Sequence, residues 1–456
     1  MIKTLLAAVL LAASTPSLAA TQVYDATGEV GGNQQWGGTL GLDFDVNQTV
    51  YVTGLGSFDA GRDGITHDIF VGIFNATTGL LVAPAVNLNG TAHISGAYDS
   101  IYAESSIRAP IMTQTQLNAL TFPFADVPAP AQAIEVADGI FWVRMPLPFA
   151  LNHINLWLLR DGAGWTLVDC GFGIDATLAL WEQIFATLLD GKKIQRIIVT
   201  HYHPDHVGCA GWLQQRWNSE VWMTETEYLS AHAAIADGGG DSIGRATELF
   251  RRHGLTGERL ESNAVRKNNY KKGVPSLPYS FHRILEGDEI SIDGKNWKVI
   301  VGRGHAPEHA MLFCAESNVL ISGDQVLPKI TTNVGVWPSQ PNGDPLKLFL
   351  DSMDKFVGLP GDVLILPSHG PVFRGLHERL AQLKHHHDER LAEVVAACAE
   401  PKTAAELLPV LFRRELDGHQ VVFAMGEAIA HLNYLMYGGR LTRNESADGV
   451  LYFGRP

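Results

Sequence analysis

The stretch from Ile198 to Trp212, IVTHYHPDHVGCAGW, places three histidines and one aspartate within six residues, directly after a run typical of a buried strand. Side chains two positions apart at a strand end share a face, so His201 and His203 can point at one ion. The turn that follows swings Asp205 and His206 toward a second point. Imidazole and carboxylate groups suit Zn, Fe or Mn. This turn therefore predicts a metal site, and ordinary polar residues at a strand end are the weaker interpretation.

One turn supplies too few ligands for two ions, so further ligands are expected later in the chain. Three later segments repeat the order of an apolar strand, a small residue and a potential ligand. These segments place His305 after KVIVGRG, Asp324 after NVLISG and His369 after DVLILPS. Rigid strands that aim side chains into loops are a common way to assemble a site at the edge of a sheet.

Together these segments resemble the metallo-β-lactamase-fold hydrolase superfamily over roughly residues 121–375. The resemblance rests on the His-x-His-x-Asp-His turn, the Gly-His-x-Pro-x-His segment at 304–309, the Ser-Gly-Asp motif and the Ser-His-Gly motif. It implies an α/β fold of the αββα sandwich type and a hydrolase similar to glyoxalase II. It also implies two metal sites: His201, His203 and His305 would hold one ion, Asp205, His206 and His369 the other, and Asp324 would bridge them.

The resemblance extends to residues around the ligands. Asp169, in the strand GWTLVDCGFG, matches a carboxylate that in this family supports the His-x-His-x-Asp-His turn, called here the metal turn. The resemblance also implies that Asp205 orients the nucleophile and helps protonate the leaving group. His309 and His153 are further candidates for supporting a ligand or contacting substrate. For His153, an ordinary histidine in a turn is the alternative. Cys209 is predicted to be a packed thiol and not a nucleophile.

Two cations a few ångströms apart lower the pKa of a shared water from about 15.7 toward 7 and polarise a carbonyl or phosphoryl oxygen. The sequence therefore predicts a hydrolase that uses a metal-bound hydroxide, with two divalent ions, zinc first and iron or manganese as alternatives. A small thioester or related acyl compound is the favoured substrate. The alternatives are a phosphodiesterase or ribonuclease, a lactonase, a β-lactamase, and a non-catalytic exported binding protein, because a fold alone does not choose among substrates.

The chain of 456 residues, with a net charge of −14, is long enough for several domains. Residues 1–20 have one early Lys, a short apolar run and a Ser-Leu-Ala close, and predict a signal peptide and a secreted or periplasmic protein. Residues 21–110 predict a β-sandwich module from alternating short strands. An Asp-rich turn at 59–63 is more typical of a solvated turn than of a Ca²⁺ site. No other segment predicts a membrane span.

The catalytic domain is predicted at 111–375 and a helical, winged-helix-like domain at 376–456. All four cysteines lie beyond residue 110 without a disulfide framework, which predicts buried thiols and suggests a catalytic part of cytoplasmic origin. The three consecutive histidines at 385–387 cannot share one ion well, and a solvated helix face is predicted for them.

The predicted partner is a small-molecule substrate, with a homodimer as a further possibility. The acidic balance disfavours nucleic acid. One basic cluster stands out, which either receives an anionic group of the substrate or is a solvated surface. Its members are Arg251, Arg252, Arg266, Lys267, Lys271 and Lys272.

Overall fold

The computed structural model describes residues 120–149, 151–237, 240–264 and 270–456, and in the N-terminal part only the strands. The chain divides into two compact units, residues 1–119 and 120–456. The predicted Asp-rich turn, the signal peptide apart from β1, and two members of the basic cluster, Arg266 and Lys267, lie outside the described residues. The three boundaries between the four predicted segments remain predictions.

Among its described residues, the N-terminal unit contains strands only. Strands β2, β1, β3, β7 and β6 form a sheet in that order, β8 also pairs with β3, and β4 pairs with β5. The predicted β-sandwich module remains a prediction. The strands are β1 (Val9–Ala13), β2 (Thr21–Gln22), β3 (Val50–Phe58), β4 (Ile69–Phe74), β5 (Leu81–Leu88), β6 (His93–Ile94), β7 (Ser100–Ala103) and β8 (Pro110–Ile111).

The second unit contains two large sheets. The first has seven strands in the order β15-β14-β13-β12-β11-β10-β9, antiparallel from β9 to β12 and parallel from β12 to β15. Its strands are β9 (Ala133–Ala137), β10 (Ile140–Pro146), β11 (His153–Asp161), β12 (Gly164–Val168), β13 (Ile194–Ile198), β14 (Glu220–Met223) and β15 (His282–Arg283).

The second sheet has five strands in chain order, antiparallel up to β19, while β20 is parallel to β19. Its strands are β16 (Glu289–Ile292), β17 (Lys295–Gly302), β18 (His309–Cys314), β19 (Val319–Gly323) and β20 (Leu364–Pro367).

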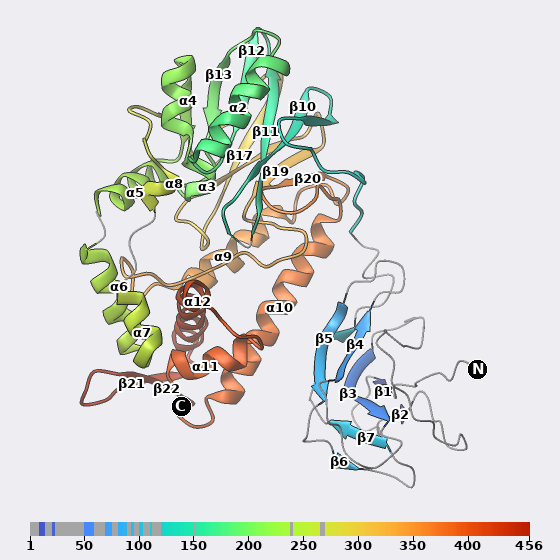
Figure 1. Ribbon diagram of the computed structural model, residues 1–456, viewed down its shortest axis with the longest axis vertical. Coiled ribbons are helices and arrows are strands. Elements are labelled where there is room, and N and C mark those ends of the chain that lie inside the picture. Colours follow the sequence, from blue (N-terminus) through green and yellow to red (C-terminus); the bar gives the residue numbers. More distant parts are fainter. Residues whose placement is uncertain are drawn as a thin grey trace. The chain divides into compact units, whose positions relative to one another are not determined.

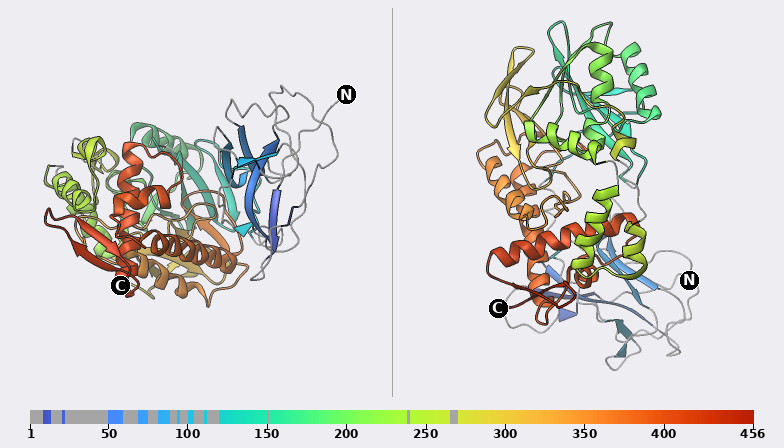
Figure 2. Two further views of the ribbon diagram at one scale, coloured as in Figure 1. Left: turned by 90° about the horizontal axis from the view of Figure 1, so that it is seen from below. Right: turned by 90° about the vertical axis from the view of Figure 1, so that its left-hand side faces the viewer.

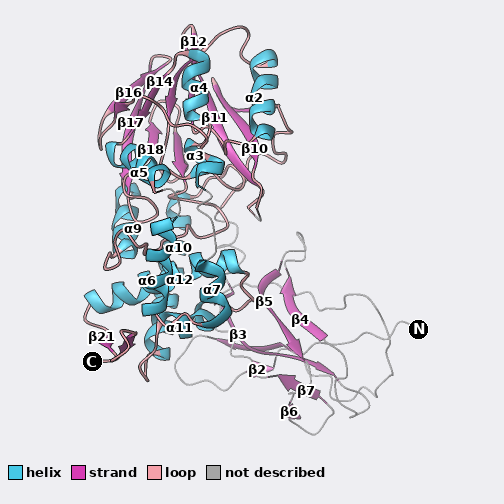
Figure 3. Ribbon diagram, turned by 60° about the vertical axis from the view of Figure 1, so that its left-hand side comes forward, coloured by secondary structure: helices cyan, strands magenta, loops and turns pink. Residues whose placement is uncertain are grey.

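Helices connect the parallel strands and cover the outer faces of the sheets (Figures 1 and 3). Helix α2 (Asp175–Thr187) follows β12, and α3 (Pro204–Val207) and α4 (Ala210–Trp217) follow β13. Helix α9 (Pro345–Met353) and the short η1 (Asp354–Phe356) lie between β19 and β20. The chain between β14 and β15 forms a helical insertion, with α5 (Glu225–Ala236), α6 (Gly240–Arg252), α7 (Gly257–Ala264) and α8 (Tyr270–Gly273).

The alternating directions of side chains along the strands explain this layering. On β10, Phe141 and Val143 pack in the core shared with α2, while Trp142 packs in the core shared with the second sheet. On β11, Leu156 and Trp157 divide in the same way. Successive strand side chains point to opposite faces, so a strand apolar at every position is buried on both sides. The result is the predicted αββα sandwich.

The C-terminal region, coloured orange to red in Figure 2, packs through one core against α9 and the outer face of the second sheet. It consists of three helices and a hairpin, α10 (Leu376–Ala397), α11 (Ala404–Leu411), α12 (Gly418–Tyr437), β21 (Thr442–Glu445) and β22 (Leu451–Gly454). Apolar residues of these helices share one core with Ile300 of β17, Leu320 of β19 and Phe349 of α9. The helical character predicted for this region is confirmed, and the winged-helix likeness remains a prediction.

The solvated face predicted for the three consecutive histidines is wrong for His387. His385 is exposed and lies 3.3 Å from Glu389, but His387 is only 2% exposed. Its ring lies against Phe349 and His431, at 5.7 and 5.8 Å between ring centroids. The helix packs its third histidine into the core because that position faces α9 and α12.

The four cysteines are free and buried, as predicted. Burial raises the pKa of the Cys209 thiol to about 12, which rules against a thiolate nucleophile there. Within the part of the chain that the structure describes, no helix has the length and apolar character needed to cross a membrane.

Candidate metal centre

The predicted ligands follow the ends of strands from both sheets. His201 comes three residues after β13, His305 three residues after β17, Asp324 directly after β19 and His369 two residues after β20. Strands β12 and β13 are parallel, as are β19 and β20, so their carboxyl ends lie at the same edge. His309 begins β18 and pairs with the end of β17, which brings it to this edge as well.

The first ligand group consists of His201, His203 and His305. The Nε2 atom of His201 lies 2.9 Å from Nδ1 of His203 and 3.2 Å from Nε2 of His305. Donor atoms about 2.0–2.1 Å from a tetrahedral ion lie about 3.3 Å apart, so these separations suit a shared ion.

The second group consists of Asp205, His206 and His369, whose ligand atoms lie within 4.8 Å of one another. Oδ2 of Asp205 is 3.7 Å from Nε2 of His206 and 3.5 Å from Nε2 of His369. This group is assembled from both sheets, as the first is.

Asp324 lies between the two groups. Its Oδ1 is 3.6 Å from Nε2 of His206 and 3.4 Å from Nε2 of His369. Its Oδ2 is 3.3 Å from Nε2 of His305. The two oxygens of one carboxylate thus face two different groups, which is the geometry of a bridging ligand.

Two unpartnered atoms support a fit to metal. Nε2 of His206 and Oδ1 of Asp324 are both buried and make no hydrogen bond. Buried polar atoms are nearly always satisfied, and an ion accounts for donors aimed at a common point. Burial, followed by the neighbouring imidazoles, holds the pKa of His201 well below its usual range, so its ring is neutral with a lone pair available to a cation. The donor set therefore fits two divalent cations.

The carboxylates give the centre its negative character. Burial lowers the pKa of His206, but Asp169, Asp205 and Asp324 outweigh burial and raise that pKa well above its usual value. For the Asp324 carboxyl, burial acts to raise the pKa, but the nearby His369 and His206 outweigh burial and hold the pKa of Asp324 well below its usual range. Positive charge is favoured here.

Asp169 supports the metal turn from behind. It follows β12 at φ +60°, a left-handed conformation that Asp tolerates better than most residues. Its Oδ2 accepts from Nδ1 of His206 at 2.7 Å, and its Oδ1 accepts from the backbone N–H of Thr200 at 2.8 Å. The Thr200 hydroxyl contacts both Asp169 oxygens and Nδ1 of His201 at 3.0 Å. One carboxylate thus orients ligands of both groups.

Other contacts orient the remaining histidines. Nδ1 of His305 donates to the Asn333 carbonyl at 2.8 Å, and Nδ1 of His369 donates to the His153 carbonyl at 2.9 Å. The His153 ring accepts from the backbone N–H of Gly370 at 3.0 Å. Nε2 of the fully buried His309 accepts from the backbone N–H of Asp324 at 3.1 Å. His153 and His309 therefore contact the backbone around ligands and belong to neither ligand group.

Glu227, which sequence reasoning missed, joins two of the metal loops. Its Oε2 accepts from the Tyr202 backbone N–H at 3.0 Å, and its Oε1 accepts from the Glu308 N–H at 2.6 Å. Burial raises its pKa to about 7. Because Glu227 lies on α5, inside the helical insertion, no pattern near the ligand motifs pointed to it. Thr200 was also missed, although it directly precedes His201 and could have been recognised from its place next to the motif.

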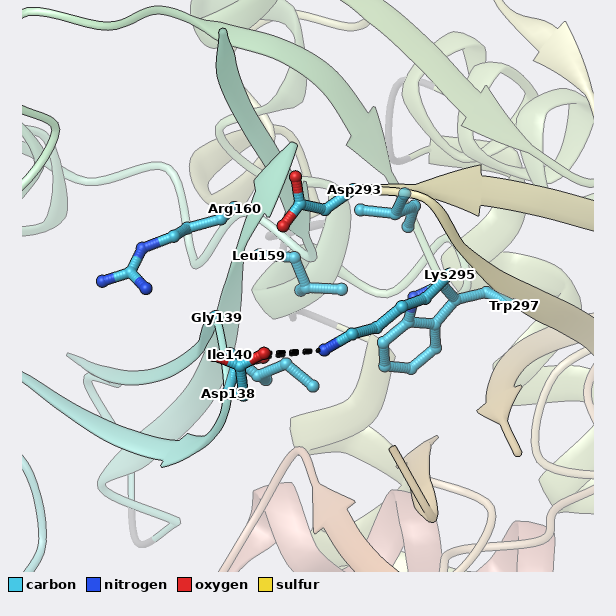
Figure 4. Close-up of a pocket in the computed structure, with 9 residues that line it drawn as sticks. Asp138, Gly139, Ile140, Leu159, Arg160, Asp293, Lys295 and Trp297 are labelled. Carbon is cyan, nitrogen blue, oxygen red and sulfur yellow. Dashed lines mark hydrogen bonds and ion pairs between the residues drawn. The ribbon is translucent and has the colours of Figure 1, made fainter. Parts of the chain in front are cut away.

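Two other places in the molecule supply no member of the two ligand groups. Arg251 and Arg252 of the basic cluster pair with Glu248 and Glu445, at 2.7 and 3.0 Å, and so contact acidic residues. A hollow lies at the opposite edge of the sheets, near the start of β10, the end of β11 and the turn between β16 and β17 (Figure 4). None of the predicted site residues lines it. It is lined by Asp138, Gly139, Ile140, Leu159, Arg160, Ile292, Asp293, Lys295 and Trp297.

The fold and the histidine–aspartate centre define a metallo-hydrolase with an αββα sandwich. A family model described as "Metallo-beta-lactamase superfamily" matches residues 151–369, and one described as "Metallo-beta-lactamase-like, C-terminal domain" matches residues 391–456. The crystal structure of a beta-lactamase domain protein from Burkholderia ambifaria is 47% identical, with a TM-score of 0.70, and covers 75% of this chain and 100% of its own. The chain therefore belongs to the metallo-beta-lactamase superfamily.

Two curated relatives are more distant. The probable metallo-hydrolase YqjP of Bacillus subtilis is 25% identical over 310 residues, which are 65% of this chain and 92% of that protein. The atrochrysone carboxyl ACP thioesterase of Aspergillus fumigatus is 24% identical over 307 residues, which are 64% of this chain and 76% of that protein.

Proposed function

We propose that this protein is a dinuclear metal-dependent hydrolase of a small thioester or a related acyl compound. The observation that carries the proposal is the position of Asp324, whose two carboxylate oxygens face two separate ligand groups. Zinc is the first choice of metal, and iron or manganese would suit the same donors.

When bound, two divalent ions would activate a water molecule and polarise the carbonyl of the substrate. The protein's part is to present imidazole nitrogens at fixed positions and to manage a proton. Asp205 has the more exposed of the two carboxylates in the centre, 16% against 10% for Asp324. This greater exposure supports a role in which Asp205 takes a proton from water and passes it to the leaving group. Hydrolysis adds OH to the carbonyl carbon and H to the sulfur, which yields a carboxylic acid and a thiol.

Two considerations favour an acyl substrate. One curated relative is named as a thioesterase of an acyl carrier protein, although the identity is only 24%. The net charge of −14 opposes long polyanionic substrates such as RNA. Lactones and β-lactams share the acyl carbonyl and remain alternatives on the same centre.

The test is a comparison of four substrate classes on one preparation of the full chain. Metal-loaded and metal-free enzyme are assayed against a small acyl thioester, a lactone, a phosphodiester and a β-lactam, with Asp205→Asn as the matched variant. We expect metal-dependent thioester hydrolysis that falls sharply in the variant. Preferred cleavage of the phosphodiester would overturn the substrate class. Two bound ions without turnover of any substrate would favour a non-catalytic binding protein.

We further propose that the chain is exported, with residues 1–20 as a cleaved signal peptide before a β-sandwich module. N-terminal sequencing of the protein from periplasmic and culture fractions should begin near residue 21. An intact Met1 would oppose export. Gel filtration of the same material tests the proposed homodimer.

A further inference from the structure

One polar side chain interrupts the apolar pattern of β11 near the end of the strand that reaches the metal centre. Asn155 directly precedes the apolar run that begins with Leu156 and Trp157, and it is fully buried. Trp157 packs in the core shared with the second sheet, so Asn155, two positions before it, points to the same side. A buried amide costs free energy unless its hydrogen bonds are made, whereas an apolar side chain would not. The contacts of Asn155 therefore need an explanation beyond packing.

Those contacts go to the loop that follows β20. Nδ2 of Asn155 donates to the Pro367 carbonyl and to the Gly370 carbonyl, each at 2.8 Å. The backbone N–H of Asn155 donates to the Ser368 carbonyl at 2.7 Å. One residue of the first sheet thus holds the carbonyls of three residues in a run of four, and the fourth residue of the run is the predicted ligand His369.

Arg144 on β10 fixes the orientation of this amide. Arg144 and Asn155 are direct partners in the register of β10 and β11. Nε of Arg144 donates to Oδ1 of Asn155 at 3.2 Å, so the NH₂ end of the amide faces the loop. Nη2 of Arg144 also donates to the Gly370 carbonyl at 3.4 Å. The orientation of the amide is therefore set within the first sheet and used on a loop of the second.

The ring and the backbone of His369 are held by different groups. Nδ1 of the His369 ring donates to the His153 carbonyl at 2.9 Å, which sets the rotation of the ring. Asn155 instead holds the peptide groups on both sides of His369. On the other side of the loop, a Cβ added to Gly370 would lie 2.9 Å from Cγ of Pro328, so the loop has little room to move that way.

We propose that Asn155 is a positioning residue for His369 and, through it, for the ion of Asp205, His206 and His369. It keeps the backbone of this ligand where Nε2 of His369 lies 3.5 Å from Asp205 and 3.4 Å from Asp324. The proposal rests on the metal assignment made under the proposed function. It gives the inner face of the first sheet a part in placing a ligand that the second sheet carries.

The expected effect is confined to one ion. A residue that orients a metal ligand typically contributes about 10- to 100-fold to metal affinity. In Asn155→Ala, two carbonyls beside His369 lose their amide donor, while the contact with Ser368 remains because it uses the backbone. The ion of His201, His203 and His305 should keep its affinity, because the hydrogen bonds of Asn155 go to the loop of His369.

The test follows metal release from the full chain to chelators of graded affinity, together with urea unfolding of the metal-free protein. Asn155→Ala should weaken one of two ions by about 10- to 100-fold and leave the other unchanged. Asp161→Asn is the matched control, because it disturbs buried hydrogen bonds at the opposite end of the same strand. The control should lower the free energy of unfolding and keep both metal affinities, which separates a general loss of stability from an effect on the ligand.

His369→Ala shows whether Asn155 acts through the ligand. This variant should keep the ion of the other group, and adding Asn155→Ala to it should not weaken that ion. Arg144→Met removes the group that orients the amide from a position that is only partly buried, so it serves even if Asn155→Ala folds poorly. It should weaken the same ion, by less than Asn155→Ala does.

Several results would overturn the role of Asn155 and leave two bound ions in place. They are equal weakening of both ions in Asn155→Ala, the same loss in Asp161→Asn, and unchanged affinities in Asn155→Ala or Arg144→Met. Fewer than two ions in the wild type would overturn the dinuclear assignment, and this proposal with it.

Discussion

Replacing Asp169 by Asn tests whether one carboxylate supports the metal turn. In the native protein, Oδ2 accepts from His206 Nδ1 and Oδ1 accepts from the Thr200 backbone N–H, at 2.7 and 2.8 Å. An asparagine has only one oxygen, and its NH₂ group can only donate. Whichever way the amide turns, one of these two donors faces another donor.

The magnitude follows from that loss. A buried group left without its hydrogen bond costs about 1–3 kcal/mol, and each 1.4 kcal/mol is a factor of ten in an equilibrium constant. If the protein keeps its fold and the cost falls on metal binding, the affinity for the ion at His206 should fall by about 5- to 150-fold. Part of the cost can appear instead as a lower free energy of unfolding.

The assay is chelator competition together with urea unfolding, on the variant and on Asp161→Asn as a control. Asp161 is a buried aspartate at the opposite end of β11, where its Oδ2 accepts from the Thr166 hydroxyl at 2.6 Å. The control should lose stability and keep its metal affinity. If Asp169→Asn binds both ions as tightly as the wild type and is as stable, the role assigned to Asp169 is wrong.

Three further predictions address the ligands, their supports and the C-terminal core. Asp324→Ala should lose at least one of two ions by elemental analysis, together with nearly all turnover, because both ligand groups lose a donor; two retained ions with near-normal turnover would contradict the bridging role. His309→Ala should retain both ions and lose about 10- to 100-fold in turnover, since it leaves the Asp324 N–H unpaired, and His153→Ala should lose less because its carbonyl, which holds His369, remains; loss of both metals in either variant would reverse the assignment. Burial lowers the pKa of His387 to about 3, so this ring is neutral in the folded protein and takes up a proton on unfolding below about pH 6.5. The contribution of this neutral ring to the free energy of unfolding is complete above pH 6.5 and falls as the pH drops toward 3, by about 2 kcal/mol at pH 5. Between pH 7.5 and 5, the free energy of unfolding in urea should therefore decline by about 2 kcal/mol less in His387→Leu than in the wild type. Equal declines in both proteins would refute this.

The ligand-bearing strands were predictable because two local signals coincide in each. A short β-branched run predicts a buried strand, and the polar residue right after it has to leave the sheet at its edge. Strands β13, β17, β19 and β20 all end within three residues of their predicted ligand. The αββα layering follows from the same runs, since strands such as β11 are apolar on both faces.

Contacts made through backbone groups could not be predicted from the sequence. Glu227 acts by accepting from two N–H groups, and Asn333 acts through its carbonyl; any residue has these backbone groups, so no residue type marks them. Their positions depend on how α5 and α12 pack against the loops, which is decided by tertiary contacts.

The burial of His387 could have been predicted from the sequence. On α10 the buried side chains Leu380, Leu383, His387, Leu391 and Val394 follow each other at intervals of three and four residues. That spacing is one face of a helix. The three consecutive histidines had to point in three directions, and the leucines on either side show which of the three faces inward.

The position of the centre links metal binding to the cohesion of the fold. His201, His203, Asp205 and His206 follow a strand of the first sheet, whereas His305, Asp324 and His369 follow strands of the second. Each ligand group therefore takes donors from both sheets, and an ion bound there stabilises the folded state in which the sheets are packed together. Asp169 reaches this centre from the end of β12, and Glu227 reaches the loops around it from α5. Metal affinity and stability are consequently coupled, and a supporting residue should appear in both measurements, whereas a buried residue at the far edge, such as Asp161, should appear only in the second.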